Sequence, residues 1–323
     1  MRCSTSTRSS CMAKSSTRLK AVILAGGSGE RFWPLSTPER PKQFLDIFGG
    51  KSLLRQSVER LQGLVAPEDV IVVTASQLVS ATQRELPEVP PGNIIGEPCR
   101  RDTAAAVAMG VAAAGDGMVG VFPADQLVSR PGRFRQAVRQ AAKLASASER
   151  IAVLGIEPLA PSTQFGYINP KTGKFVEKPD AKRARDYIRK GYLWNAGIFV
   201  AGYGTFRRAI ESLAPGLEPL FAPGCDFAAV YPELPKISFD YAVMEKYPHI
   251  GVVAADCGWD DVGGYLALER HFPELADPDG NLVLAKAQPV KLLGVRNLVV
   301  VSAPDGVLVV DKSHLGDIKT LFR

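Results

Sequence analysis

The feature that most constrains the fold is a regular alternation of short apolar runs and helix-period segments over residues 20–156. The apolar runs have the length of buried strands and lie at 20–24, 70–73, 94–95, 118–122 and 151–156. Segments with helical spacing separate most of them at 52–61, 103–114 and 133–144, and Asp102 or Thr103 is the expected cap of the second. Strands that alternate with helices predict an α/β fold with a mostly parallel sheet covered on both faces.

The pattern changes after Pro158. Short β segments at 165–169, 174–177 and 197–200 mix with helices at 181–190, 205–213 and 238–247, the last capped by Ser238 or Asp240, and another apolar strand lies at 252–255. From Asn281 onward, β runs at 282–284, 298–301 and 307–310 alternate with turns. We therefore expect a main domain at 19–272 and a small C-terminal β domain at 273–323, with the boundary at 273–280.

Composition excludes several classes of protein. Hydrophobic residues make up 46% of the 323 residues, yet no apolar run approaches the ~18 residues of a membrane span. Of the net charge of +6, five positive charges lie in the acid-free residues 1–20, so the body lacks the basic excess of a nucleic-acid-binding protein. The five cysteines are scattered without CxxC spacing, which predicts neither a zinc site nor a disulfide framework. Free thiols fit a protein of the reducing cytoplasm.

Residues 1–18 are rich in Ser, Thr and Arg. This composition resembles a transit peptide, but the segment has neither an apolar stripe nor an apolar run. A second methionine at Met12 also allows the stretch to lie upstream of the true start. We expect a disordered, non-functional tail, with targeting as the alternative.

A glycine-rich loop after the first predicted strand is the first candidate site. Residues 24–29 read LAGGSG, and successive N–H groups of such a loop can bind an anion. The glycine spacing is neither that of a P-loop nor that of the GxGxxG dinucleotide motif. Arg31 and Lys42 follow closely and would place two cations at the mouth of the loop. The sequence predicts a polyphosphate site, with a plain tight turn as the alternative.

Carboxylates at two predicted strand ends indicate a metal site. Asp125 follows the strand at 118–122, and Asp260 and Asp261 follow the strand at 252–255. The carboxyl ends of parallel strands converge on one crevice. Since Mg²⁺ needs only one or two carboxylates when phosphate oxygens complete its shell, we expect Asp125 and Asp261 to hold it. A helix cap is the alternative role for Asp125.

Polar residues in apolar surroundings form a third candidate group. Glu177 and Lys178 stand at a strand end, Asn195 precedes a buried strand, and Gly166 lies at another strand edge. Sugars are bound by such a mixture of carboxylate, amide and backbone groups, and a lysine suits a phosphate. The group is a candidate sugar-phosphate site, although each residue alone is more often structural.

Eight motifs occur in the order typical of the mannose-1-phosphate guanylyltransferases, a branch of the sugar nucleotidyltransferases. They are LAGGSGERFWPL, PKQFLDIFG, FPAD, FGYI, FVEKP, WNAGIFV, SFDYAVMEK and WDDVGGY. The resemblance runs from about Lys20 to Leu268, and the KQF after Pro41 is similar to the guanylyl, mannose-type branch. The chain departs from the usual motifs at Asp102, Ala105, Gln126, Ala196, Gly264 and Tyr265. None of these changes removes a charge that the reaction needs, although Asp102 could alter nucleotide affinity.

The resemblance implies a Rossmann-like nucleotide-binding fold, a catalytic domain at 19–272, and a truncated, β-helix-like C-terminal segment. It implies transfer of GMP from GTP to mannose 1-phosphate, which gives GDP-mannose and pyrophosphate, with Mg²⁺ or another divalent cation. The expected catalytic residues are Arg31 and Lys42, and the expected metal ligands are Asp125 and Asp261. The expected nucleotide-binding residues are Leu24, Ala25, Gly26, Gly27, Ser28, Gly29, Glu97, Asp102 and Thr103, with Glu97 pairing guanine through N1–H and the 2-amino group. The expected sugar-phosphate residues are Gly166, Glu177, Lys178 and Asn195.

Other functions stay open at this point. One is a non-catalytic regulatory homologue that binds a sugar nucleotide, and retention of Arg31, Lys42, Asp125 and Asp261 argues against it. Another is a nucleotidyltransferase for a different hexose 1-phosphate. A nicotinamide-dependent dehydrogenase is opposed by the glycine spacing. Neither nucleic acid nor membrane is an expected partner, and a homodimer is allowed.

Overall fold

A computed structural model describes residues 18–27 and 29–322. The tail expected at 1–18 lies outside these ranges except for Arg18, whose Nη2 forms an ion pair with Glu68 Oε1 at 2.6 Å. Within the described ranges, no helix is long and apolar enough to cross a membrane. The thiols of Cys99, Cys225 and Cys257 are free.

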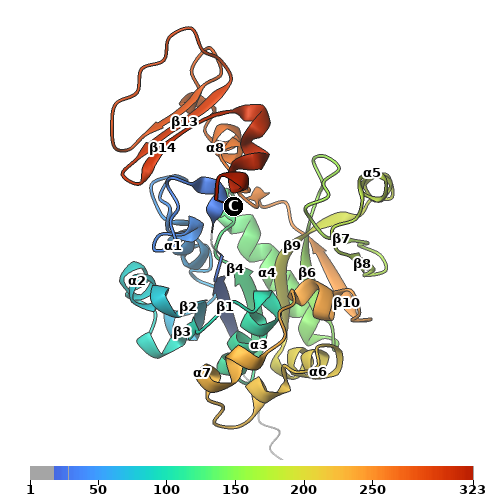
Figure 1. The fold of residues 1–323 in the computed structure, drawn as a ribbon. Helices are drawn as coiled ribbons and strands as arrows, with labels where there is room; N and C mark the ends of the chain where they lie inside the picture. Colours follow the sequence, from blue (N-terminus) through green and yellow to red (C-terminus); the bar gives the residue numbers. More distant parts are fainter. Residues whose placement is uncertain (1–17, 28, 323) are drawn as a thin grey trace, which may run out of the picture.

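One large twisted sheet forms the centre of the molecule, with the strand order β10-β6-β9-β4-β1-β2-β3 (Figure 1). Its strands are β1 (Leu19–Ala25), β2 (Val70–Ala75), β3 (Ile94–Glu97), β4 (Met118–Pro123), β6 (Ile151–Ile156), β9 (Leu193–Gly202) and β10 (Ile250–Ala254). β7 (Tyr167–Ile168) and β8 (Phe175–Val176) extend it beside β9. β5 (Leu127–Val128) and β11 (Trp259–Asp260) form a separate antiparallel pair.

The pairing confirms the predicted mixed, mostly parallel sheet. β1 runs parallel to both β2 and β4, β2 is parallel to β3, and β10 is parallel to β6. Only β9, in the main strand order of the described chain, runs antiparallel to its neighbours β4 and β6. Leu24 is in register with Pro123, and Ala75 with Glu97, so the carboxyl ends of β1, β4 and β3 lie along the same edge.

Helices cover both faces of the sheet. α1 (Leu53–Glu59) and α4 (Pro131–Ser146) pack their apolar residues into one core, whereas α3 (Asp102–Ala114) and α6 (Tyr203–Leu213) pack into the core on the other face. The remaining helices are α2 (Val79–Glu85), α5 (Ala181–Arg189), α7 (Phe227–Val230) and α8 (Leu266–His271). Two short 3₁₀ turns, Glu30–Phe32 and Lys42–Phe44, follow β1.

A smaller sheet of β12 (Leu282–Ala285), β13 (Leu298–Ala303) and β14 (Gly306–Asp311) projects as a lobe at one end of the molecule (Figure 1). β12 and β13 pair in parallel, as neighbouring coils of a β-helix do, whereas β13 and β14 form an antiparallel hairpin. A third core cluster joins Leu282 and Val299 of this sheet to Phe32 and Phe48 near the N-terminus. The lobe is therefore anchored on the segment that follows β1.

Two local expectations need correction. The helix expected at 238–247 is a single π-type turn, Asp240–Met244, because the Glu245 N–H bonds to the carbonyl of Asp240, five residues back. Neither Asp102 nor Thr103 is the N-cap of α3, a position that Arg101 occupies. Asp102 instead accepts a hydrogen bond from its neighbour Thr103, whose hydroxyl accepts from the Phe239 N–H of a distant segment.

Candidate active site

The glycine-rich loop leaves the carboxyl end of β1 and lies against two later segments of the chain. Gly29 has φ 64°, and a Cβ there would lie 2.4 Å from the backbone nitrogen of Lys42, so a glycine is needed. A Cβ on Gly26 would lie 2.5 Å from Oε2 of Glu97. Gln43 donates to the carbonyl of Ala25 at 2.6 Å and ties the loop to the Lys42–Phe44 turn. Ser28 lies outside the described residues.

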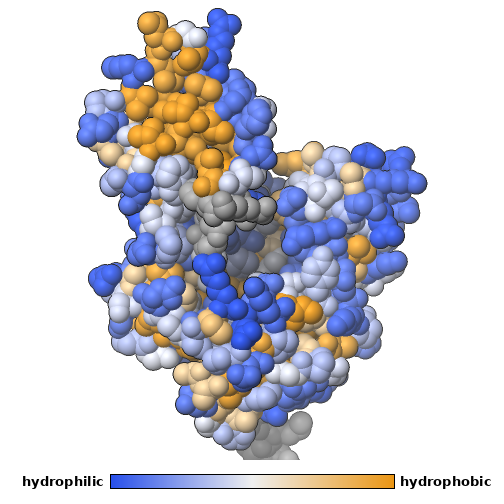
Figure 2. Space-filling view, viewed as in Figure 1, coloured by the Kyte–Doolittle hydropathy of each residue, from blue (hydrophilic) through white to orange (hydrophobic). Residues whose placement is uncertain are grey.

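A cavity of about 390 Å³ opens beside this loop. Every described residue of the expected nucleotide site except Gly29 lines it, together with charged residues that the expectation did not include. The lining is Leu24, Ala25, Gly26, Gly27, Gln43, Val73, Glu97, Arg100, Arg101, Asp102, Thr103, Ala106, Pro123, Asp125 and Lys236. The space-filling view shows a hollow on this face below the C-terminal lobe (Figure 2).

Glu97 is one of the residues that line this first cavity. Its Oε1 accepts a hydrogen bond from the hydroxyl of Tyr231, which comes from a segment 134 residues later. Burial raises the pKa of Glu97, while the Tyr231 hydroxyl opposes that shift by stabilising the carboxylate. Tyr231 was missed from sequence because nothing near it marks it as a partner of Glu97.

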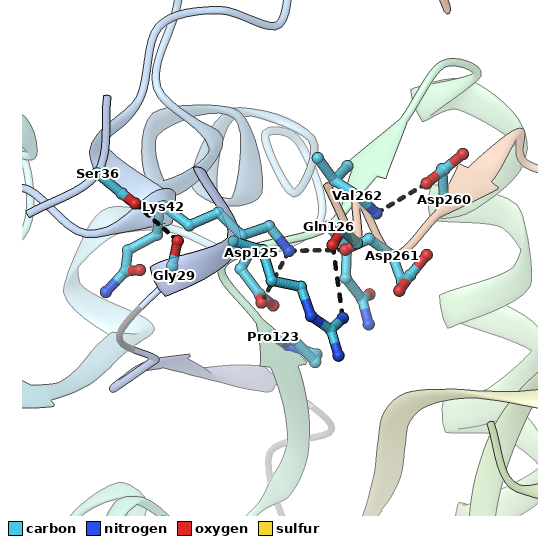
Figure 3. Close-up of polar contacts among 12 residues, drawn as sticks. Gly29, Ser36, Lys42, Pro123, Asp125, Gln126, Asp260, Asp261 and Val262 are labelled. Atoms are coloured by element: carbon cyan, nitrogen blue, oxygen red, sulfur yellow. Dashed lines mark hydrogen bonds and ion pairs between the residues drawn. The ribbon is translucent and has the colours of Figure 1, made fainter. Parts of the chain in front are cut away.

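Lys42 is the centre of the polar cluster between the loop and two strand ends (Figure 3). Its side chain is largely buried, and Nζ donates to Oδ2 of Asp125 at 3.0 Å and to the main-chain carbonyl of Asp261 at 2.7 Å. The Asp125 carboxylate turns toward Nζ, whereas the Asp261 carboxylate points away from it. Asp125 caps no helix, because the N-cap of the next helix is Arg130.

The neighbouring aspartates Asp260 and Asp261 differ in their surroundings. Asp260 binds Arg270 at 2.9 Å and His271 at 3.0 Å, and these partners lower its pKa against the opposing effect of burial. In the described part of the chain, no hydrogen bond reaches the carboxylate of Asp261, and burial together with the charges of Asp260 and Asp125 raises its pKa. Asp261 is thus a carboxylate that gains from a cationic ligand.

A second cavity of about 470 Å³ adjoins the first, since Thr103, Pro123 and Asp125 line both. Its lining is Gly29, Arg31, Phe32, Lys42, Thr103, Pro123, Asp125, Gln126, Gln164, Lys178, Asp261, Val262 and Gly263. Arg31 is exposed there, and its Nη1 lies 3.4 Å from the carbonyl of Gly263. The structure therefore brings Arg31, Lys42, Lys178 and both candidate metal ligands around one space.

Hydrogen bonds and an ion pair connect the candidate sugar-phosphate residues in two pairs, Gly166 with Asn195 and Glu177 with Lys178. Asn195 donates through its backbone N–H to the carbonyl of Gly166 at 2.8 Å and through Nδ2 to Asp240 at 2.8 Å. Lys178 pairs with Glu177 at 3.1 Å, and Oε2 of Glu177 is buried without a hydrogen-bond partner in the described structure. A buried acceptor without a partner suits a ligand hydroxyl.

Backbone strain marks the same two cavities. Among non-glycine residues in the described ranges, positive φ occurs at Asp102 (63°), Lys178 (41°), Val262 (51°) and Asn297 (57°). The first three line one of the two cavities. Such conformations persist where the surrounding structure enforces them, and they concentrate at functional sites.

Asp240 was not among the expected site residues, although it lies in the motif SFDYAVMEK. Burial and the nearby charge of Glu177 raise its pKa to about 7. The folded protein then binds a proton that the unfolded chain releases near pH 4, so stability falls as pH rises between these values. Asp240→Asn is expected to remove this loss and to reduce the decline in melting temperature between pH 5 and pH 8 by about 2 °C or more.

Scanning calorimetry at the two pH values measures this difference. The exposed Asp256, paired with Arg130, supplies the control Asp256→Asn, which should keep the wild-type decline. An equal decline in Asp240→Asn and wild type would show that Asp240 titrates normally.

Comparisons with known proteins agree with this geometry. The family model described as "Nucleotidyl transferase" matches residues 20–277. A mannose-1-phosphate guanylyltransferase of Klebsiella pneumoniae is 34% identical over 93% of this chain and 72% of its own length. One from Escherichia coli K12 is 32% identical over 95% of this chain and 73% of its own length.

Solved structures show the same fold. A structure from Thermus thermophilus, described as a "mannose-1-phosphate geranyltransferase", has a TM-score of 0.85 and 37% identity over 94% of this chain and 98% of that one. A structure from Helicobacter pylori described as a mannose-6-phosphate isomerase has a TM-score of 0.63 at 24% identity and supports the fold alone. The chain belongs to the nucleotidyl transferase family, and mannose-1-phosphate guanylyltransferases are among its relatives.

Proposed function

We propose that the chain transfers GMP from GTP to α-D-mannose 1-phosphate and releases pyrophosphate, with 19–272 as the catalytic domain and 273–323 as a small domain attached to it. The observation that carries the proposal is the position of Lys42. It lines the second cavity together with Lys178, which pairs with Glu177, and it binds Asp125, a residue that lines both this cavity and the one beside the glycine-rich loop. A nucleotide in the first and a sugar phosphate in the second would meet beside its ammonium group.

In the proposed reaction, an oxygen of the sugar phosphate attacks the α-phosphorus of GTP in line with the leaving group. A new phosphorus–oxygen bond forms, the bond to the oxygen bridging to the β-phosphate breaks, and its electron pair leaves with pyrophosphate. Such a transfer depends on positioning and charge neutralisation. The amides of residues 26–29 and Arg31 bind the β- and γ-phosphates, and Lys42 offsets the charge that builds up at the α-phosphate.

Asp125 and Asp261 are the proposed ligands of Mg²⁺ or another divalent cation. Two carboxylates fit a hard cation, and the partly buried carboxylate of Asp261 lies near the like charges of Asp260 and Asp125, with no hydrogen-bond partner among the described residues. Within residues 18–27 and 29–322, no group of three or more His, Cys, Asp or Glu is placed to hold an ion. Phosphate oxygens would therefore have to complete the shell. When bound, the cation would supply positive charge to the phosphate oxygens.

The sugar side is assigned to Gly166, Glu177 and Asn195, with Lys178 on the phosphate. Asp102 and Thr103 line the nucleotide cavity with the loop residues Leu24 to Gly29. We place the protein in the cytoplasm, with GTP, mannose 1-phosphate and GDP-mannose as its ligands. The homodimer stays a prediction, because the structure contains one chain.

A substrate panel tests the proposal. The kcat/KM of pyrophosphate release should be highest for GTP with mannose 1-phosphate, compared with ATP, UTP or dTTP and with glucose 1-phosphate. A higher value for glucose 1-phosphate would assign the chain to another hexose. A higher value for another nucleotide would remove guanine from the proposal.

Base choice is assigned to Glu97, whose carboxylate can accept from both N1–H and the 2-amino group of guanine. Glu97→Gln replaces one acceptor with a donor and should narrow the preference for GTP over ITP, which lacks the 2-amino group, by about 10-fold or more. Tyr231→Phe keeps the carboxylate but removes its hydrogen bond. It should narrow the same preference by a smaller factor.

The ratio of kcat/KM for GTP to that for ITP is the measurement. Glu88→Gln, on a glutamate that pairs with Arg55 away from the cavity, is the matched control. An unchanged ratio in Glu97→Gln would move guanine recognition to other groups, such as the backbone near Leu24.

A further inference from the structure

Arg60 is a buried cation that the proposed reaction does not use. It directly follows α1, and it is 5% exposed. Its guanidinium carbon lies 5.2 Å from the centre of the Phe134 ring, in the core between α4 and the sheet. In the described chain it forms no ion pair, since no carboxylate oxygen lies within 4 Å of it. An arginine buried in this way is costly unless other groups satisfy it.

Two main-chain carbonyls of one short segment accept hydrogen bonds from the Nη atoms of Arg60, whereas its Nε is buried without a hydrogen-bond partner in the described structure. Nη2 donates to the carbonyl of Pro123 at 2.9 Å, and Nη1 donates to the carbonyl of Gln126 at 3.0 Å. These two residues flank Asp125 in the sequence, and the Asp125 carboxylate accepts a hydrogen bond from Nζ of Lys42 (Figure 3). The planar fork of one guanidinium thus fixes both ends of the turn that carries Asp125.

Segment 123–126 is also held by contacts outside Arg60, but none of these reaches the carbonyls of Pro123 and Gln126 in the described chain. The Ala124 N–H donates to the carbonyl of Leu24 at 2.9 Å and ties the start of the segment to β1. At the other end, the Gln126 side chain donates to the carbonyl of Ala196 at 2.7 Å, and the next residue, Leu127, pairs with Asp260 between β5 and β11. Because a lysine has a single ammonium point rather than a fork, it cannot reproduce the paired bonds to Pro123 and Gln126.

The positive charge of Arg60 also interacts with the charge of Asp125 in segment 123–126. Burial lowers its pKa to about 10, with Cys257 and Asp125 opposing the shift, so the guanidinium stays protonated at neutral pH. A fixed positive charge then lies behind the place where two phosphate-bearing substrates would meet. Preorganised charge of this kind favours anionic ligands without any rearrangement during the reaction.

We propose that Arg60 is a positioning residue for the transfer reaction. Its hydrogen bonds to the carbonyls of Pro123 and Gln126 hold segment 123–126, so that Asp125 keeps its place beside Lys42 and the substrate phosphates. The proposal rests on the proposed function for its kinetic consequence. Its structural consequence, a segment held in place by Arg60, is independent of which nucleotide or sugar is used.

The test compares Arg60→Lys and Arg60→Met with Arg55→Met. Arg55 lies in α1, which Arg60 directly follows, and pairs with Glu88 at 2.6 Å outside the two cavities, so it controls for loss of a nearby arginine. Amide hydrogen exchange of a peptide covering residues 121–128 should be about 10-fold faster in Arg60→Lys, with exchange in β2 unchanged. Arg55→Met should exchange like wild type in both regions.

Kinetics provide the second readout. Arg60→Lys should lower kcat about 10-fold, change the KM for GTP less than 3-fold, and raise the Mg²⁺ concentration for half-maximal rate. Combined with Asp125→Asn, its effect on kcat should shrink, because both changes act through one carboxylate. If Arg60→Met does not fold, Arg60→Lys alone decides the matter.

Unchanged exchange at 121–128 in Arg60→Lys would overturn the positioning role. So would faster exchange with unchanged kcat and Mg²⁺ dependence, or a loss of activity that only follows the unfolded fraction. A wild-type protein that transfers no nucleotide to any sugar phosphate would refute the proposed function instead. The comparison of hydrogen exchange at 121–128 between Arg60→Lys and wild type would still show whether Arg60 holds this segment.

Discussion

Lys42→Ala is expected to lower kcat by about 10²-fold or more, the scale for losing one electrostatic contact made in the transition state. The ammonium of Lys42 is held in the second cavity by Asp125, which lines both cavities, and by the carbonyl of Asp261. No other described cation has both contacts. The KM for GTP should change much less than kcat, because in the proposed site Arg31 and the loop amides, not Lys42, bind the leaving phosphates. Steady-state pyrophosphate release measures both constants.

Two comparisons make this result specific. Lys51→Ala, at a lysine paired with Glu59 on the surface, should leave kcat unchanged. Lys42→Ala should also not raise the Mg²⁺ requirement, because it frees the Asp125 carboxylate from its ion pair. A folded Lys42→Ala protein that keeps more than about a third of wild-type kcat would remove Lys42 from the mechanism, since one lost transition-state contact costs far more.

Asp125→Asn and Asp261→Asn are each expected to raise the Mg²⁺ concentration for half-maximal rate by about 10-fold or more. Each variant removes one carboxylate charge while keeping the shape of the side chain. The melting temperature should change little in Asp261→Asn, because no hydrogen bond within the described chain depends on its carboxylate, and its burial is unfavourable for the charged form. Rate measurements over a Mg²⁺ series with saturating GTP provide the test.

The neighbouring Asp260 is the matched control. Its carboxylate binds Arg270, His271 and the Val262 N–H, so Asp260→Asn should lower the melting temperature and leave the Mg²⁺ dependence unchanged. If Asp125→Asn or Asp261→Asn instead lost several degrees and kept a normal Mg²⁺ curve, that aspartate would be structural.

Much of the fold and of the site's location could be predicted from sequence, because both depend on local patterns. Apolar runs of strand length predicted β1, β4 and β6. The rule that ligands bind at the carboxyl ends of parallel strands predicted that the glycine-rich loop and Asp125 lie close together. The register of β1 with β4 explains why this works, since Leu24 and Pro123 are partners in the sheet.

The rest depends on contacts between distant segments that carry no local signal. Lys42 contacts the main-chain carbonyl of Asp261 rather than its carboxylate, and only the path of the backbone decides this. Tyr231 reaches Glu97 from 134 residues away. Arg60 looks from sequence like an ordinary surface arginine at a helix end, and its burial follows from how α1 packs on the sheet.

The most direct test of the central claim is the stoichiometry of one incubation containing the full chain, Mg²⁺, GTP and mannose 1-phosphate. The account predicts that GDP-mannose and pyrophosphate form in a 1:1 ratio, that neither forms when either substrate is omitted, and that Lys42→Ala slows both equally. Binding of GDP-mannose by the wild-type protein without formation of pyrophosphate from GTP and any hexose 1-phosphate would contradict it. The chain would then be a sugar-nucleotide-binding regulatory homologue.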